Sequence, residues 1–177
     1  MLRRVLLLVV CVVAMLMLVA CRRSQSTGPS ISRSEAKELL MRINQTLSTD
    51  DRVAIEQYIE QSGLQGVRQS PTGLFYLIEG DTSGQRAALN SVVEYRYSIT
   101  LLDSTECYAP AEPKQIMVGK GGVESGVEEA LQLMHVGQRA MLIIPPHLAH
   151  GLAGDGQQIP PRAIIVYRIE LMSVVAR

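Results

Sequence analysis

Residues 118–151 read V-G-K-G-G-V-E-S-G-V-E-E-A-L-Q-L-M-H-V-G-Q-R-A-M-L-I-I-P-P-H-L-A-H-G, and this stretch decides the fold. Its first half carries apolar side chains three and four residues apart, at Val127, Ala130, Leu131 and Met134. This spacing predicts one face of a short helix that ends near Gly137. The apolar run 140–144 follows and is closed by Pro145 and Pro146, which cannot donate to a sheet ladder. The run therefore predicts a short strand after the helix.

Strand patterns stand on both sides of this helix. Residues 147–161 are rich in Gly and Pro, which predicts an ordered surface loop, and a strand resumes over 164–171. Upstream, strands are predicted at 74–79, 91–102 and 116–118. In the second of these, apolar and polar residues alternate, which places the apolar set on one face of a sheet. A run of strands with one inserted helix predicts the α+β class, with a curved antiparallel sheet wrapped around one short α-helix.

Two short amphipathic helices are predicted before the sheet. Ser32 and Glu35 fit a capping box, and apolar residues follow at helical spacing. A second helix start is predicted at 48–51, where two acidic residues would lie at the positive end of a helix, and Gly63 ends that helix. Two interpretations stay open: the helices are an N-terminal addition to a monomer, or they pair with a second copy of themselves in a homodimer.

Composition excludes several classes of protein. The 177 residues are 47% hydrophobic, with 17 basic against 17 acidic residues, so a basic surface for nucleic acid is not expected. Aromatic residues make up only 4% of the chain, so the core must be built mainly from aliphatic side chains. Of the three cysteines, only Cys107 lies in the predicted folded part, which excludes an internal disulfide framework there.

The N-terminus has the pattern of a lipoprotein signal peptide. Positive charge at Arg3 and Arg4 precedes an apolar run that ends in Leu-Val-Ala-Cys, which resembles the lipobox of bacterial lipoproteins. We therefore expect residues 1–20 to be the signal peptide, Cys21 to carry the lipid and residues 21–33 to form a flexible tether. The alternative is an uncleaved membrane anchor, since about 20 apolar residues can span a bilayer. Arg22 after the cysteine lacks an aspartate-type retention signal, so we expect a periplasm-facing outer-membrane anchor in the cell envelope.

No constellation of catalytic, metal-ligating or cofactor-binding residues is recognisable in the chain. His147, His150 and Asp155 lie close in sequence, but flanking prolines and glycines deny the histidines a helical spacing that would converge them on a metal. The neighbouring acids 128–129 point in different directions on a helix. The glycines at 119–122 lack the spacing of a phosphate-binding loop. We therefore expect neither a metal nor a cofactor.

The motifs of the central stretch nevertheless resemble a known family. The series G-K-x-x-V-x-x-G-V-E-E-A-L, M-x-V-G-Q-R-A-x-L-x-I-P-P, A-x-G and I-P-P-x-A-x-x-V-Y-x-I-E-L is similar to the FKBP-type peptidyl-prolyl cis-trans isomerases, from about Leu74 to Met172. With the helices and the lipobox, the chain looks more narrowly like the FKBP-type lipoproteins of Bacteroidetes, including the gliding-motility-associated group. The resemblance implies an isomerase domain at 71–177 behind a helical segment at 34–70. It also implies an apolar pocket between sheet and helix.

The resemblance also assigns pocket residues, some of which depart from the family pattern. Four positions match, namely Tyr95, Val123, Ile159 and Tyr167, the last standing where the family usually has Phe. Four departures follow: the family's tryptophan floor falls on Val127, its rim tyrosine on His150, and its Phe-Asp pair on Cys107 and Tyr108. The isoleucine whose backbone N–H holds the substrate falls on Glu124. Because an aromatic side chain buries about 150–250 Å², its loss at 127 should weaken the grip on proline.

Three functions are compatible with this pattern. The first is a lipid-anchored isomerase that helps proline-containing unfolded or nascent envelope proteins to fold, without covalent catalysis. The second is a chaperone or binding lipoprotein on the same fold with weak or no isomerase activity. The third is a structural or assembly lipoprotein that uses the N-terminal helices to bind partners.

Overall fold

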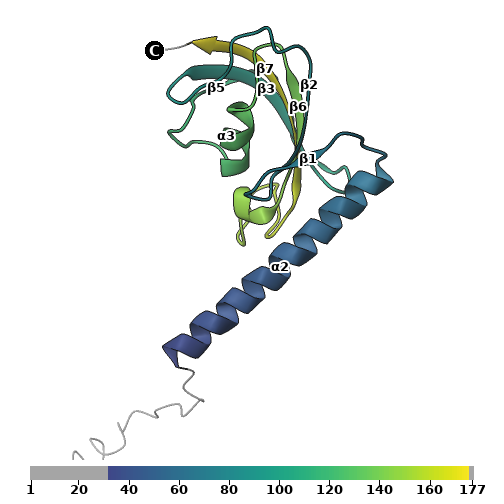
Figure 1. The fold of residues 1–177 in the computed structure, drawn as a ribbon, viewed down its shortest axis with the longest axis vertical. Coiled ribbons are helices and arrows are strands. Elements are labelled where there is room, and N and C mark those ends of the chain that lie inside the picture. The colour runs from purple at the N-terminus through teal and green to yellow at the C-terminus, as the bar shows by residue number, and fades with distance from the viewer. Residues whose placement is uncertain (1–31, 176–177) are drawn as a thin grey trace, which may run out of the picture. The chain divides into compact units, whose positions relative to one another are not determined.

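The computed structural model describes residues 32–175 (Figure 1). Cys21, the signal peptide and nearly all of the tether predicted before residue 34 lie outside the described residues. The elements in chain order are α2 (Arg33–Gln61), β1 (Arg68–Gln69), β2 (Phe75–Glu79), β3 (Val92–Leu101), β4 (Glu106–Tyr108), β5 (Lys114–Met117), α3 (Ser125–Leu131), β6 (Arg139–Ile144), the 3-10 helix η1 (Pro146–Leu148) and β7 (Ile165–Val175). The chain divides into two compact units, one ending at Met41 and one beginning at Arg42.

The seven strands of the second unit form one antiparallel sheet, in the order β1-β2-β6-β7-β3-β4, with β5 also paired to β3. The sheet curves around α3, which lies on its inner side (Figure 1). The predicted α+β class and the curved sheet around one short helix are therefore confirmed. Two short strands, β1 and β4, are additions to the prediction, and β1 lies after Gly63 within the segment 34–70.

The sheet buries apolar side chains on both faces, and β6 shows why. Ala140, Leu142 and Ile144 join the main core with α3, while Ile143 joins a second cluster on the outer face. Side chains of a strand alternate between faces, so only a strand covered on both sides reads as a continuous apolar run. This accounts for the uninterrupted sequence Ala-Met-Leu-Ile-Ile in β6.

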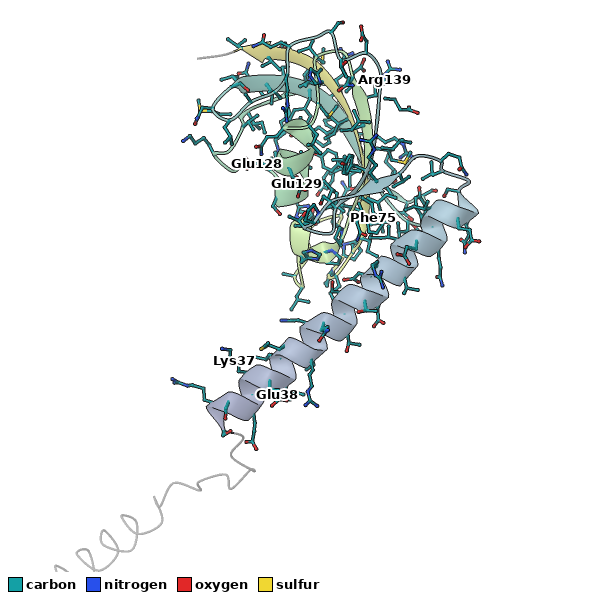
Figure 2. All side chains as sticks on the ribbon, viewed as in Figure 1. Lys37, Glu38, Phe75, Glu128, Glu129 and Arg139 are labelled. Atoms are coloured by element: carbon teal, nitrogen blue, oxygen red, sulfur yellow. The ribbon has the colours of Figure 1, made fainter. Side chains whose placement is uncertain are left out.

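The second unit's part of α2 covers the outer face. Ile55 is fully buried there against Phe75, Ile143 and Val166, which come from β2, β6 and β7 (Figure 2 labels Phe75). This packing joins the helix to three central strands. No helix among residues 32–175 has the length and apolarity needed to cross a bilayer.

The prediction of two separate N-terminal helices is wrong, because α2 is one continuous helix of 29 residues. The hydroxyls of Thr46 and Thr49 donate to the carbonyls of Arg42 and Gln45, at 3.1 and 2.9 Å. They thus bond back to the preceding turn instead of capping a new helix. No Gly or Pro occurs between Arg33 and Gln61 to break the helix. The homodimer expected through this segment stays a prediction.

Both ends of α2 follow the predicted chemistry. Glu35 accepts from the Ser32 N–H at 2.8 Å, and the Ser32 hydroxyl accepts from the Glu35 N–H at 3.2 Å, which completes the capping box. At the other end Gly63 adopts φ +63°, and the N–H groups of Gly63 and Leu64 donate to the carbonyls of Glu60 and Ile59. This is a Schellman termination, which requires a left-handed residue at Gly63.

Helix α3 is shorter than predicted and ends at Leu131 rather than near Gly137. Beyond it the chain turns to bond with an upstream segment: the Ala87 N–H donates to the Met134 carbonyl at 3.1 Å, and the Val136 N–H to the Gln85 carbonyl at 2.9 Å. Met134 is fully buried all the same. Its apolar spacing therefore reports burial in the core and not continuation of the helix.

We predict that Ile55→Ala lowers the free energy of unfolding by about 2–5 kcal/mol, because it leaves a cavity between α2 and the sheet. Val53→Ala on the same helix is the matched control, since Val53 is 42% exposed and its loss should change stability by about 0.5 kcal/mol or less. Urea unfolding followed by circular dichroism measures both. Equal effects of the two substitutions would contradict the packing of α2 on the outer face.

Candidate active site

Three tyrosines meet on the inner face of the sheet. Tyr97 of β3 and Tyr167 of β7 stack with ring centroids 5.1 Å apart and an interplanar angle of 23°. Tyr95 and Tyr97 point to the same face of β3, and their centroids lie 5.9 Å apart. The cluster gives this aromatic-poor chain one concentrated aromatic surface. Tyr97 was not predicted as a site residue, although its alternation with Tyr95 could have indicated it.

The predicted floor residues lie in the same core but are closed to solvent. Val127 of α3 and Tyr95 are 0% exposed, Tyr167 is 1% exposed and Ile159 is 3% exposed. All four belong to one apolar cluster, against which the partly buried Val123 also packs. The resemblance therefore names positions that share one buried core, and their role as a substrate pocket stays a prediction. It did not predict that the floor would be covered.

A carboxylate at the N-cap of α3 contacts an imidazole from the loop that follows η1. Oε1 of Glu124 and Nε2 of His150 are 3.0 Å apart, and the two side chains are 12% and 26% exposed. After burial, the charge of Glu124 is a cause that raises the pKa of each of Tyr95, Tyr97 and Tyr167. The carboxylate therefore lies within electrostatic range of all three tyrosines.

Burial keeps the tyrosines protonated. It is the largest cause that raises the pKa of both Tyr95 and Tyr167 far above the ordinary value of 10.0. The two hydroxyls lie close enough to influence each other, but the geometry at Tyr95 is not that of a hydrogen bond. The Tyr95 hydroxyl is thus a neutral donor facing the interior of the site.

Three buried polar atoms at this place have no hydrogen-bond partner within residues 32–175. They are the Tyr95 hydroxyl, Oε2 of Glu124 and Nε2 of His150, whose approach to Oε1 of Glu124 lacks hydrogen-bond geometry. The backbone N–H of Glu124 also donates to no group in this part of the chain. Buried polar groups are nearly always paired, so such a concentration indicates a site for a hydrogen-bonding ligand.

Asp155 holds the loop that carries Ile159. Its carboxylate accepts from the Tyr108 hydroxyl, from the Gln157 N–H at 2.9 Å and from the Ile159 N–H at 2.8 Å. The Sγ of Cys107 contacts the Gln158 carbonyl at 3.7 Å, so β4 also packs against this loop. Cys107 and Tyr108 therefore support the wall of the site. Asp155 was missed as a supporting residue, although an Asp followed by Gly is a recognisable turn signal.

The other candidates from the sequence do not join this site. Nε2 of His147 bonds to the Thr72 carbonyl at 3.0 Å, and no group of three metal-ligating residues forms within residues 32–175. Glu128 accepts from the Gly121 N–H and Glu129 from the Thr72 hydroxyl, so these adjacent acids of α3 serve different contacts (Figure 2). Both act in positioning loops.

A hollow of about 470 Å³ lies on the opposite, outer face of the sheet. Its lining includes Glu79, Arg139, Glu170 and Arg96, which are cross-strand neighbours of alternating charge on β2, β6, β7 and β3 (Figure 2 labels Arg139). Arg139 and Glu170 pair at 3.2 Å. Arg96 points away from its neighbours Tyr95 and Tyr97, so its charge lies on the face of β3 opposite the tyrosine rings, although Tyr97 also contributes to the lining of this hollow.

Comparison with known proteins identifies the family and the fold. The family model for FKBP-type peptidyl-prolyl cis-trans isomerase matches residues 84–172, just over half of the chain. The chain belongs to the FKBP-type peptidyl-prolyl cis-trans isomerase family. The resemblance in the sequence is therefore confirmed at the level of the family, and every pocket position named above except the tether cysteine lies within the matched residues.

Individual FKBP-type relatives cover different parts of the chain. Peptidyl-prolyl cis-trans isomerase FKBP10 of Homo sapiens is 35% identical over 96 residues, which are 52% of this chain and 16% of that protein. The FKBP-type 22 kDa peptidyl-prolyl cis-trans isomerase of Escherichia coli is 33% identical over 123 residues, 67% of this chain and 59% of that protein. The chain thus spans less than two thirds of the length of these relatives.

Solved structures of FKBP-type proteins extend the similarity beyond the family match. FkpA from Escherichia coli is 28% identical, with a TM-score of 0.61 over 82% of this chain and 74% of that chain. A peptidyl-prolyl cis-trans isomerase from Pseudomonas syringae pv. tomato is 26% identical, with a TM-score of 0.64 over 75% of this chain and 96% of that chain. Both support the FKBP-like arrangement of the curved sheet and α3.

We predict that Asp155 makes the stability of this FKBP-type domain depend on pH between about 4 and about 2. The Tyr108 hydroxyl, above all, holds the pKa of Asp155 at about 2 against an ordinary 3.8, assisted by the Gln157 and Ile159 N–H groups. Because the folded pKa is depressed, this stabilisation is complete above the unfolded pKa and is lost as the pH falls toward 2.

Chemical denaturation of Asp155→Asn at a series of pH values tests this assignment. The variant should lose less stability than the wild type between pH about 4 and about 2, because it lacks the titrating carboxylate. Asp50→Asn is the control, since Asp50 is exposed on α2. A steep wild-type acid dependence that survives unchanged in Asp155→Asn would contradict the role of this carboxylate.

Proposed function

We propose that this chain is a peptidyl-prolyl cis-trans isomerase that uses the tyrosine site without covalent catalysis. The observation that carries the proposal is the combination of an apolar floor with unpartnered donors, the Tyr95 hydroxyl and the Glu124 backbone N–H. Isomerisation of an X-Pro bond needs no nucleophile, metal or cofactor. It needs an environment that favours the twisted amide over the planar one.

The chemistry follows from amide resonance. Rotation about the bond is opposed by about 18–20 kcal/mol, and the twisted state has less charge separation than the planar state. A dry apolar floor therefore destabilises the planar amide relative to the twisted one, while a fixed donor holds a substrate carbonyl. Each tenfold increase in rate needs only about 1.4 kcal/mol.

Substrate entry must displace the side chains at the entrance. Since Val127, Tyr95 and Tyr167 have almost no exposed surface, a proline ring reaches them only after neighbouring side chains move aside. We propose that Glu124 and His150 are the side chains that move, because they are 12% and 26% exposed and so lie at the solvent boundary. Entry of the substrate is thus coupled to opening of this carboxylate–imidazole contact.

A second candidate function is a binding module with weak isomerase activity. The observation in its favour is Val127, which is fully buried at the position of the family's tryptophan floor and offers no aromatic face to a proline. A peptide could then bind to the donors and the tyrosines without being gripped tightly enough for the twisted amide to be stabilised.

We further propose that the protein acts in the cell envelope on proline-containing unfolded or nascent proteins, anchored to the outer membrane by a lipid on Cys21. The support for this proposal is the N-terminal pattern of positive charge, an apolar run and Leu-Val-Ala-Cys.

Isomerisation of short proline peptides by the full-length chain in detergent tests the two candidate functions. A rate well above that of buffer supports the isomerase. A rate equal to buffer, together with suppressed aggregation of an unfolded client protein, favours the binding module.

We predict that Tyr95→Phe lowers kcat/KM for isomerisation by about tenfold, the effect of losing one hydrogen bond of about 1.4 kcal/mol in the transition state. Stability should stay equal or rise by about 1 kcal/mol, because the variant removes a buried hydroxyl without a partner. Tyr58→Phe on α2 is the matched control for both readouts. An unchanged kcat/KM in Tyr95→Phe would remove this hydroxyl from the reaction.

We predict that Cys21→Ser abolishes fatty-acid labelling of the protein and shifts it to the aqueous phase in detergent partitioning. Cys11→Ser is the matched control, because Cys11 lies inside the apolar run of the predicted signal peptide and its loss should leave labelling intact. Labelling that persists in Cys21→Ser would exclude the lipoprotein anchor.

A further inference from the structure

The acidic side chain at the entrance of the site lacks a complete set of partners. Glu124 is only 12% exposed, and Oε1 lies 3.0 Å from Nε2 of His150. Oε2 is buried and accepts no hydrogen bond within residues 32–175. A buried carboxylate oxygen without a donor is costly, so a donor supplied by a ligand would be favoured.

The charged groups around Glu124 do not supply a complete cationic partner for its carboxylate. Asp155 adds a second carboxylate close to His150, whose charge contributes to lowering the pKa of Asp155. The Nζ of Lys114 donates to the Gly122 carbonyl at 3.2 Å and lies 6.0 Å from the centroid of the Tyr97 ring. Neither contact supplies a donor to Oε2 of Glu124.

The aromatic surroundings suit a cation as well. Tyr95, Tyr97 and Tyr167 form one aromatic cluster within electrostatic range of the carboxylate, and the faces of tyrosine rings attract ammonium and guanidinium groups. An anionic side chain would meet the charges of Glu124 and Asp155 and would be repelled. An apolar side chain would leave Oε2 without a donor.

We propose that Glu124 is a specificity-determining residue that selects peptides carrying Lys or Arg next to the proline. The cationic side chain replaces His150 as the partner of the Glu124 carboxylate when the entrance opens, while the proline occupies the floor. This inference rests on the proposed function, because it assumes that the tyrosine site binds proline peptides.

The test compares peptides that differ in one charge. Two series, Ala-Xaa-Pro-Phe and Ala-Pro-Xaa-Phe, carry Xaa as lysine or as N-acetyl-lysine, which keeps the length and removes the charge. Binding to the full-length chain in detergent is measured by calorimetry, and isomerisation is measured separately on the same peptides. We expect lysine to bind at least about tenfold more tightly in one of the two series, a charge-assisted contribution of about 1.4 kcal/mol.

Matched variants assign the preference to the carboxylate. Glu124→Gln keeps the size of the side chain and removes its charge. In this variant the ratio of the affinities for the lysine and the acetyl-lysine peptide should fall to about twofold or less. In Glu60→Gln, which makes the same change in net charge on the exposed surface of α2, the ratio should stay as in the wild type. In the wild type the ratio should also fall as salt is raised from about 0.05 to about 0.5 M, which tests the charge even if Glu124→Gln fails to fold.

The outcomes separate this inference from the proposed function. Equal binding of lysine and acetyl-lysine in both series, or a ratio unaffected by Glu124→Gln, overturns the inference even if isomerisation is observed. A lysine preference that depends on Glu124 without any isomerisation supports the inference and defeats the proposed catalytic function. Binding of none of the peptides overturns the inference.

Discussion

The close approach of α3 to β6 at Gly126 determines where the α3 residues of the site lie relative to the sheet. A Cβ added at Gly126 would lie 2.7 Å from Cγ2 of Ile144 and 3.4 Å from Cβ of Leu148, which is too near for an ordinary contact. Only glycine lets the helix lie this close to the strand. Glu124 and Val127 stand two residues before and one residue after this contact, so it fixes both the entrance and the floor opposite the tyrosines of β3 and β7.

The same contact connects the two faces of the sheet. Ile144 and its neighbour Ile143 belong to opposite clusters, one under α3 and one under α2. A shift of β6 would therefore disturb the tyrosine site and the packing of Ile55 together. The covering helix on the outer face thus contributes to the site by holding β6 in place, although it supplies no residue to the chemistry.

The sequence predicts those parts of the site that depend on local pattern and misses those that depend on contacts over distance. Tyr95 and Tyr167 could be placed by strand alternation and by their motifs, and Val127 by helical spacing. The continuity of α2 could not be predicted in this way. A Thr at position 49 can cap the start of a new helix or donate to the carbonyl of the preceding turn, and tertiary packing decides between the two. The contact between the Glu124 and His150 side chains could not be predicted either, because it joins residues 26 positions apart in the sequence.

The departures from the family pattern change which interactions can hold a substrate. A large aromatic floor contributes through about 150–250 Å² of buried area, at about 25 cal/mol per Å², and it does so for any proline peptide. Val127 offers less area, so this general contribution is reduced. A hydrogen bond to a charged group contributes about 1.5–3 kcal/mol, but only when the ligand carries the matching charge. Exchanging apolar area for the Glu124 carboxylate therefore lowers affinity for proline peptides in general while preserving it for a cationic subset. On this argument the loss of the aromatic floor and the gain of a buried carboxylate are one change in selectivity, made at the N-cap and at the third residue of the same short helix.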